Sequence, residues 1–330
     1  MALFKQLDEQ VERLLSLFNK EDNWLIIINA DPDALGSAMA LRRIMARKVG
    51  SIGIAQINEI KRPDNLSMIR YLRIPTHKLI PNLAAQYDKF ALVDSQPNHN
   101  PEFAPYKFSL VIDHHPIDKE HPVEADFVDI RPKYGAVCTM MTEYLYNMKI
   151  RPAKLLATAL MYGIRCDTKT FEREFIDADM AAFKYLSKFA DSKLMNRISR
   201  SEFHLDWMRY FSRAFYNLRR IGHGLYAHCG KVDNPDILVI VADFFTRVHN
   251  VPWVVVSGTA DDKLVVILRG DGMRRDMGKM AQTLMNGLGS AGGHKQAARA
   301  EVEVVELDGE DPEIFMLKRL GQGKTTIHRI

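Results

Sequence analysis

The sequence has few cysteines and no long apolar segment. Its three cysteines, Cys138, Cys166 and Cys229, lie far apart without a Cys-x-x-Cys pair, so neither a disulfide framework nor a thiolate zinc site is indicated. The longest apolar runs, such as ILVIVA at 237–242, are far shorter than the about 20 residues of a membrane-spanning helix. The N-terminal stretch MALFKQLDEQVERLL carries charges where a signal peptide needs an apolar core. We therefore expect a cytoplasmic protein that is neither exported nor inserted into a membrane.

The sequence also lacks a strong excess of one charge. Lys and Arg number 45 against 41 Asp and Glu, which leaves a net charge of +4. This balance permits an anionic ligand but not the dense basic stripe of a dedicated DNA-binding protein. With 330 residues, 47% hydrophobic and 26% charged, the chain resembles ordinary globular proteins and is long enough for two domains.

Short apolar runs organise the first half of the chain. WLIIINA (24–30), KFALVDS (89–95) and FSLVIDHH (108–115) are separated by long polar or helical stretches, a pattern typical of parallel strands buried on both faces. Amphipathic helices are expected over 3–18 and 34–45. We predict an α/β fold with a mainly parallel sheet in the N-terminal domain and a smaller α/β C-terminal domain.

The second half of the chain begins with a different pattern. Residues 204–222 resemble a connecting helix that ends at glycines. ILVIVAD (237–243), VPWVVVSGTADDKLVVILRG (251–270) and AARAEVEVVEL (297–307) then predict strands. The expected domains are residues 1–190, a helical linker over 191–224, and residues 225–330.

Carboxylates and imidazoles follow the predicted strands and one helix. They occur in four segments, as Asp31 and Asp33 in NADPDALGS, Asp94 in LVDSQP, Asp113, His114 and His115 in VIDHHP, and Asp167 in MYGIRCDT. A parallel sheet brings such strand ends to one edge. Mixed oxygen and nitrogen donors suit a divalent ion such as Mn²⁺ or Mg²⁺, and a carboxylate between two ions would bridge them for phosphoryl transfer.

Each of these residues could also have a purely structural role. Asp31 could cap the following helix, and Asp94 and Asp167 could be turn residues. Single histidines are common in loops. The occurrence of all four segments in this order favours a metal site.

These motifs resemble those of a known family. DPDALGS, VDSQP, DHH and CDT, followed by GSAGGHKQAARA at 289–300, are similar in order to the motifs of DHH phosphoesterases with a DHH-associated domain. The resemblance covers nearly the whole chain and extends to the bacterial oligoribonuclease and adenosine bisphosphate phosphatase group, related to RecJ-like exonucleases. It implies a catalytic domain at 1–190 and a substrate-binding domain at 225–330.

The resemblance also implies residue roles. Asp33, Asp94, His114 and Asp167 match the ligands of one metal, with Asp94 bridging to a second ion that Asp31 also binds. His115 matches the catalytic histidine beside the scissile phosphate. Asp113 is expected to orient the loop. The predicted substrate-binding residues are Arg269, Gly292, Gly293 and His294.

Two positions depart from the family pattern. Ile27 stands where the family usually has a histidine ligand, so we expect two Mn²⁺ or Mg²⁺ ions with one weakly held. Arg299 replaces the last glycine of the C-terminal motif. The motif GQGKTT at 321–326 resembles part of a Walker A loop, but Lys318 occupies the position of its first glycine.

Three functions remain open from the sequence. The leading hypothesis is a metal-dependent phosphoesterase that hydrolyses short RNA or DNA oligonucleotides or small nucleotide phosphates with metal-activated water. The first alternative is a catalytically weak or inactive relative that binds nucleotides or RNA. The second is a hydrolase of inorganic polyphosphate or pyrophosphate.

Overall fold

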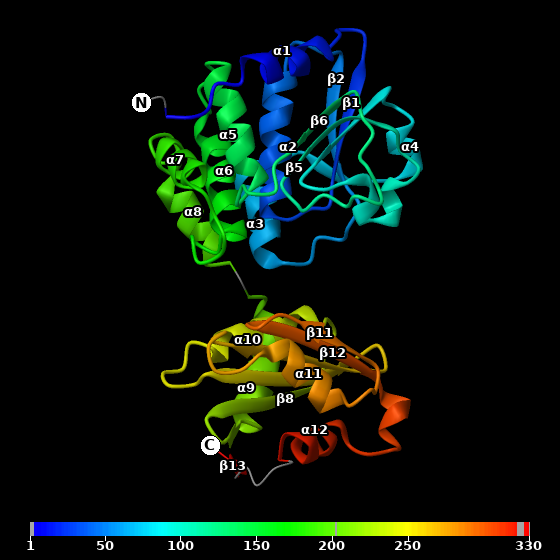
Figure 1. The fold of residues 1–330 in the computed structure, drawn as a ribbon, viewed down its shortest axis with the longest axis vertical. Helices are drawn as coiled ribbons and strands as arrows, with labels where there is room; N and C mark the ends of the chain where they lie inside the picture. Colours follow the sequence, from blue (N-terminus) through cyan, green and yellow to red (C-terminus); the bar gives the residue numbers. More distant parts are fainter. Residues whose placement is uncertain (1–2, 202, 322–326, 330) are drawn as a thin grey trace. The chain divides into compact units, whose positions relative to one another are not determined.

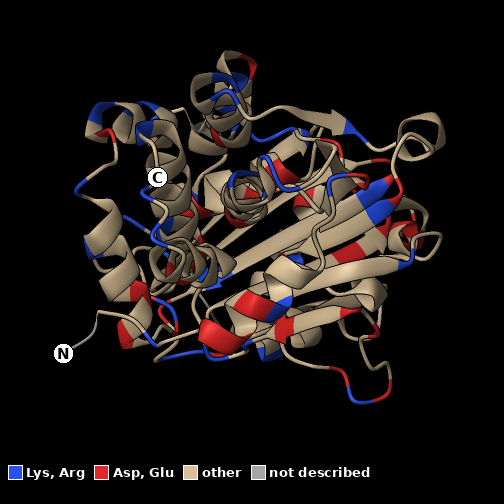
Figure 2. Cartoon of the chain, turned by 90° about the horizontal axis from the view of Figure 1, so that it is seen from above, with Lys and Arg blue, Asp and Glu red and all other residues tan. Residues whose placement is uncertain are grey.

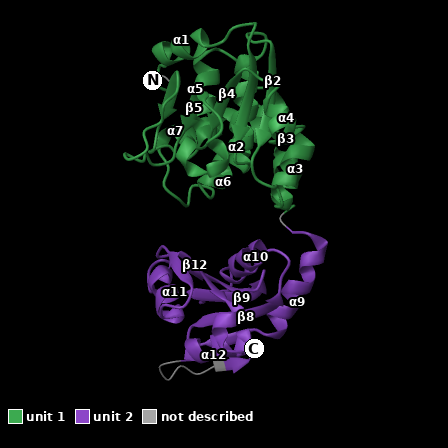
Figure 3. Cartoon of the chain, turned by 90° about the vertical axis from the view of Figure 1, so that its right-hand side faces the viewer, with its two compact units in different colours: residues 1–202 green, residues 203–330 purple. Residues whose placement is uncertain are grey.

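The protein divides into two units in its computed structural model, Met1–Glu202 and Phe203–Ile330 (Figure 3). The structure describes residues 3–201, 203–321 and 327–329, so GQGKTT lies outside it except for Gly321. The division falls inside the segment 191–224 that was expected to be a linker. Within the described residues, no helix combines the length and apolar character needed to cross a membrane. Basic and acidic residues are interspersed over the elements (Figure 2).

The first unit is built on a parallel sheet, as predicted. Its six strands are ordered β3-β2-β1-β4-β5-β6. They are β1 (Asn23–Ile28), β2 (Ser51–Gln56), β3 (Thr76–Lys78), β4 (Lys89–Val93), β5 (Phe108–Asp113) and β6 (Phe127–Ile130). The strand order reverses between β1 and β4, and such a switch point opens a crevice at the carboxyl ends of the two strands.

Helices cover this sheet. They are α1 (Asp8–Ser16), α2 (Pro32–Met45), α3 (Pro63–Leu72), α4 (Pro81–Ala84), α5 (Val137–Asn147), α6 (Lys154–Asp167), α7 (Asp177–Leu186) and α8 (Ser192–Ser199). Helices α5 to α8 form a layer beside α2 (Figure 1). Helix α2 contacts α5 and α6 closely because it carries Gly36, where a Cβ atom would lie 2.7 Å from Cys138 Sγ.

The second unit contains a mixed sheet between two helical layers. The strands are ordered β11-β12-β10-β9-β8-β7-β13. They are β7 (Arg219–Ile221), β8 (Gly224–Lys231), β9 (Trp253–Ala260), β10 (Lys263–Gly270), β11 (Ser290–Gly293), β12 (Ala297–Glu303) and β13 (Ile327–Arg329). The helices are α9 (Met208–Tyr216), α10 (Asp236–Phe245), α11 (Met277–Met285) and α12 (Pro312–Gly321). Helices α9 and α10 pack on one face of the sheet, and α11 and α12 pack on the other.

Two sequence expectations in this unit differ from the structure. The run 237–243 was predicted to be a strand but lies in helix α10. A short continuous apolar run fits a buried strand and a buried helix equally well, so its length and composition could not separate them. In the expected connecting helix, only Met208–Tyr216 is α-helical, and Phe211 packs into the core of the second unit.

Candidate metal centre

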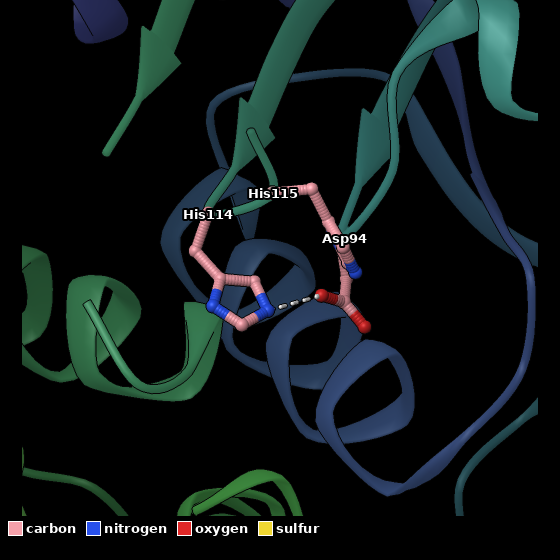
Figure 4. A group of neighbouring side chains, drawn as sticks. All are labelled: Asp94, His114 and His115. Carbon is pink, nitrogen blue, oxygen red and sulfur yellow. Dashed lines mark ion pairs between the residues drawn. The ribbon is translucent and has the colours of Figure 1, made fainter. Parts of the chain in front are cut away.

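Four predicted ligands meet at the carboxyl edge of the first sheet. Asp33 lies in the first turn of α2, Asp94 follows β4, His114 follows β5, and Asp167 ends α6. One possible ligand atom from each residue lies within 4.8 Å of the others. His114 Nε2 is 3.6 Å from Asp94 Oδ1 and 3.2 Å from Asp167 Oδ2. Figure 4 shows the imidazole and the Asp94 carboxylate turned toward each other.

The cluster contains buried polar atoms that lack a hydrogen-bond partner. Asp94 Oδ1 and His114 Nε2 are both in this state among the described residues. A buried acceptor or imidazole nitrogen without a partner is costly, and a bound cation is one way to satisfy it. These donors, three carboxylates and one imidazole, therefore fit a divalent metal ion.

A backbone carbonyl orients His114. Its Nδ1 donates a hydrogen bond to the carbonyl oxygen of Tyr134 at 2.9 Å, which leaves Nε2 for the cluster. The turn that contains Tyr134 is held by a partly buried ion-pair network, because Arg131 bonds both Asp129 at 2.6 Å and Glu143 at 2.7 Å. Such second contacts fix the tautomer and direction of a metal-binding histidine.

Helix α5 engages Asp33 through its N-terminus. The Asp33 carboxylate accepts hydrogen bonds from the backbone N–H groups of Val137 at 2.6 Å and Cys138 at 2.8 Å. These bonds favour the ionised carboxylate and fix its position. The fully buried carboxylate of Asp33, on α2, is thereby fixed against the N-terminus of α5.

The clustered groups change one another's pKa. Burial, followed by the Asp167 charge, raises the pKa of Asp33 to about 7. Burial and then the Asp33 charge raise the pKa of Asp94 well above its ordinary value. Burial opposes protonation of His114, but the nearby Asp167 carboxylate and the Asp33 charge outweigh burial and raise its pKa to about 9. A cation would relieve the repulsion between the carboxylates and replace the imidazole proton.

His115 lies beside the cluster and is held by Asp113. Its Nδ1 donates to Asp113 Oδ1 at 2.8 Å, while Gln96 Nε2 donates to Asp113 Oδ2 at 2.8 Å. The hydrogen bond to Asp113 raises the pKa of His115. Burial opposes ionisation of Asp113, but the bonds from His115 and Gln96 outweigh it and lower its pKa. Asp113 therefore orients the histidine loop, as expected from the sequence.

His99 was not predicted from the sequence as a site residue. Its ring makes an edge contact with His115, with 5.4 Å between the ring centroids, and its Nδ1 accepts a hydrogen bond from the backbone N–H of Gln96 at 3.2 Å. His99, Asp113 and His115 form a second group of neighbouring possible ligands. The only sequence signal was its place five residues after Asp94, in the segment SQPNHN.

Asp31 lies beside this ligand group, where burial and then the Asp167 charge raise its pKa, whereas Ile27 lies apart from it. Asp31 caps α2, and its side chain accepts a hydrogen bond from Ala34 N at 2.9 Å. It is not among the grouped possible ligands of the described residues. Ile27 is fully buried inside β1, in the apolar cluster on one face of the sheet. The role of Asp31 at a second ion stays a prediction.

The predicted substrate residues of the second unit lie near one end of three neighbouring strands, because Arg269 of β10 pairs with Ala297 of β12, and Gly293 of β11 pairs with the next residue of β12. Arg269, near the end of β10, bonds Asp243 Oδ1 through Nε at 2.6 Å. Gly292 and Gly293 were expected in a loop but form the end of the edge strand β11, paired with Arg299 and Ala298. Position 293 requires glycine, because its φ of 148° is rare for residues with a side chain and a Cβ atom there would lie 2.3 Å from the Ala297 carbonyl oxygen. His294 follows this strand and is exposed. Their contacts with substrate stay predictions.

The sequence is similar to a known protein family and to one curated protein. Residues 23–164 match the DHH family, N-terminal domain. An uncharacterized protein of Methanocaldococcus jannaschii is 31% identical over 276 residues, which cover 83% of this chain and 56% of that protein. The chain thus spans about half the length of the curated relative that it matches.

One solved structure shares the fold of this chain. An exopolyphosphatase-related protein from Bacteroides fragilis aligns over 95% of this chain and 98% of its own, with a TM-score of 0.66 and 13% identity. At this identity the likeness shows a common fold only. A putative family II inorganic pyrophosphatase from Methanococcus jannaschii aligns over 89% of this chain and 98% of its own, with a TM-score of 0.47 and 16% identity.

Proposed function

The chain belongs to the DHH family through its residues 23–164, and from this premise we propose that it is a phosphoesterase that uses Mn²⁺ or Mg²⁺ to hydrolyse short oligonucleotides or small nucleotide phosphates. Members of this superfamily are metal-dependent phosphohydrolases. The observation that carries the proposal is the ligand group of Asp33, Asp94, His114 and Asp167, with two buried atoms that lack partners among the described residues.

The proposed roles follow from the contacts. Asp33, Asp94, His114 and Asp167 would hold a divalent ion, which when bound supplies a water of lowered pKa and neutralises charge on the phosphate. His115 faces the same edge, and its raised pKa suits a proton donor to the departing oxygen. Asp113 would keep the His115 ring in that orientation through its bond to Nδ1.

In this proposal the second ion is bound weakly, because Ile27 stands where the family usually has a histidine ligand. Asp31 and Asp94 are the protein ligands expected for it, and Asp31 already caps α2. Titration of the metal-free chain with Mn²⁺ should show one tightly bound ion, with hydrolysis appearing only at higher concentration. Two equally tight ions would mean that another residue replaces the histidine, and His99 is the nearest candidate beside His115.

A substrate screen tests the proposal directly. The full chain is incubated with pApA, short RNA, adenosine 3′,5′-bisphosphate, cyclic dinucleotides and polyphosphate, in Mn²⁺, in Mg²⁺ and in a chelator. Metal-dependent release of nucleotide or phosphate from a nucleotide substrate supports the proposal. Hydrolysis of polyphosphate alone would favour the alternative suggested by the name of the Bacteroides fragilis protein. No hydrolysis at saturating metal would favour a nucleotide-binding protein.

A further inference from the structure

A pocket lies at the opposite edge of the first sheet from the candidate metal centre. Its volume is about 610 Å³, within the about 300–1,000 Å³ range of small-molecule sites. It lies between the end of α2, the beginning of β2 and the beginning of α6. Because Gly50, Ser51 and Ile52 mark the start of β2 in a parallel sheet, this edge holds the amino ends of the strands.

Three arginines give this pocket a strong positive charge. Arg42, Arg43 and Arg47 line it and are all exposed. None of the three forms an ion pair within the described part of the chain. Lys154 also lines the pocket, and its ammonium lies 3.8 Å from Asp191. Guanidinium groups gathered without carboxylates repel one another, and an anion with several charges would relieve this repulsion.

The wall of the pocket is apolar beneath this charged rim. It includes Met39, Val49, Ile52, Leu155 and Leu156. Val49 and Leu156 are buried, and the other three are partly exposed. An inorganic anion would contact the arginines but leave this apolar surface in water. A ligand with an aromatic ring and a phosphate chain would cover both parts.

We propose that this pocket binds a nucleoside polyphosphate, with its base against the apolar wall and its phosphates at Arg42, Arg43 and Arg47. The site differs from the proposed phosphoesterase centre, because α2 carries Asp33 in its first turn and Arg42 and Arg43 in its last turn, and Arg47 follows the helix. Arg43 follows Asp33 by ten residues, so about 15 Å of helix separates the two. The pocket would therefore bind nucleotide without the metal ion.

Binding of a fluorescent adenine nucleotide, mant-ADP, tests the proposal. Fluorescence anisotropy is measured on the full chain in a chelator, so that binding through a metal ion is removed. The variant Arg43→Glu/Arg47→Glu should bind at least about tenfold more weakly than the unmodified chain. The control Lys5→Glu/Lys188→Glu makes the same change in net charge at two other exposed positions of the first unit and should keep the affinity.

Two further measurements test whether the probe binds at this pocket and through its base. Arg220→Ala, at an exposed arginine of the second unit, should leave mant-ADP binding unchanged. Unlabelled ADP should displace the probe more strongly than pyrophosphate, since only ADP has a base. Absence of binding, equal affinity in the Arg43/Arg47 variant, loss of binding in Arg220→Ala, or equal displacement by pyrophosphate would overturn the proposal. None of these outcomes depends on hydrolysis.

Discussion

Asp94 combines a special backbone conformation with a central place in the ligand group. Its φ angle of 61° lies in the left-handed region, which Asp and Asn tolerate better than most residues. Its N–H donates to the Ile112 carbonyl oxygen at 2.9 Å. A substitution by Asn therefore preserves shape and backbone preference while it removes the charge.

We predict that Asp94→Asn abolishes metal-dependent hydrolysis in a folded protein. Changes in residues behind metal ligands already cost about 10- to 100-fold, so loss of a direct ligand should lower kcat/KM by at least about 100-fold. Mn²⁺ affinity, measured by calorimetry, should fall in parallel. The exposed Asp126→Asn is the control. A folded Asp94→Asn protein with near-normal activity would remove the metal mechanism from consideration.

His228 is a buried imidazole far in sequence from the motifs. It is 8% exposed in β8, and its Nδ1 bonds Ser257 Oγ at 2.8 Å. Burial lowers its pKa below the ordinary 6.5. On acidification the unfolded chain takes up this proton first, so the stabilising effect is present above about pH 6.5 and is lost as pH falls through the folded pKa.

We predict that the second unit loses stability on acidification partly through His228. The contribution of one such proton cannot exceed about 1.4 kcal/mol per pH unit. Urea unfolding followed by circular dichroism, from about pH 7 to about pH 5, should show a weaker pH dependence in His228→Gln than in the unmodified chain. The exposed His223→Gln should keep the original dependence. Parallel curves for all three proteins would refute this role.

At the scale of elements, the close contact of α2 with α5 and α6 positions the metal ligands. Gly36 allows this contact, because a Cβ atom there would lie 2.7 Å from Cys138 Sγ and 3.0 Å from the Ala159 carbonyl oxygen. Gly163 on α6 meets the same Sγ, at 2.5 Å from its own hypothetical Cβ. The helices therefore approach at glycines, and Asp33 near the start of α2 reaches the N-terminus of α5.

We predict that Gly36→Ala destabilises the first unit by about 1–3 kcal/mol, as expected when a methyl group is forced into a packed core. The urea midpoint should fall. Gly292→Ala is the matched control, because a Cβ atom at Gly292 would meet no atom within 4 Å. A Gly36→Ala protein as stable as the unmodified chain would contradict this prediction, because it would mean that the contact of α2 with α5 and α6 can accommodate a methyl group.

At the scale of the whole molecule, the chemistry and the proposed substrate contacts lie in different units. The ligand group belongs to Met1–Glu202, whereas Arg269 belongs to Phe203–Ile330. Arg269 is paired with Asp243 through Nε, which leaves other guanidinium N–H groups for a phosphate. Its proposed function is to hold the part of a nucleotide that does not react.

We predict that Arg269→Ala raises KM for a dinucleotide severalfold and changes turnover of a small activated phosphodiester little, because the small substrate lacks the distal part. Steady-state kinetics on both substrates measure this difference. Asp243→Asn is the matched control, since it frees the Arg269 charge and should not raise KM. Equal losses on both substrates would contradict the assignment of Arg269 to substrate binding.

The sequence by itself determined the class of the first unit and the order of its motifs. Continuous apolar runs separated by helical segments require parallel strands, and such strands place Asp94 and His114 at one edge. These inferences succeeded because periodicity and strand direction are local properties of the chain. The same local reasoning failed at 237–243, where the apolar run is short enough for either a strand or a helix.

Only the tertiary structure decided how the ligands are held. The Tyr134 carbonyl lies 20 residues from His114 in sequence, and the N–H groups that fix Asp33 lie more than 100 residues from it. It also placed His99 against His115, and Arg42, Arg43 and Arg47 around a pocket. Such contacts join residues distant along the chain, and their geometry depends on how helices and strands pack. Spacing within a single sequence contains no measure of that packing.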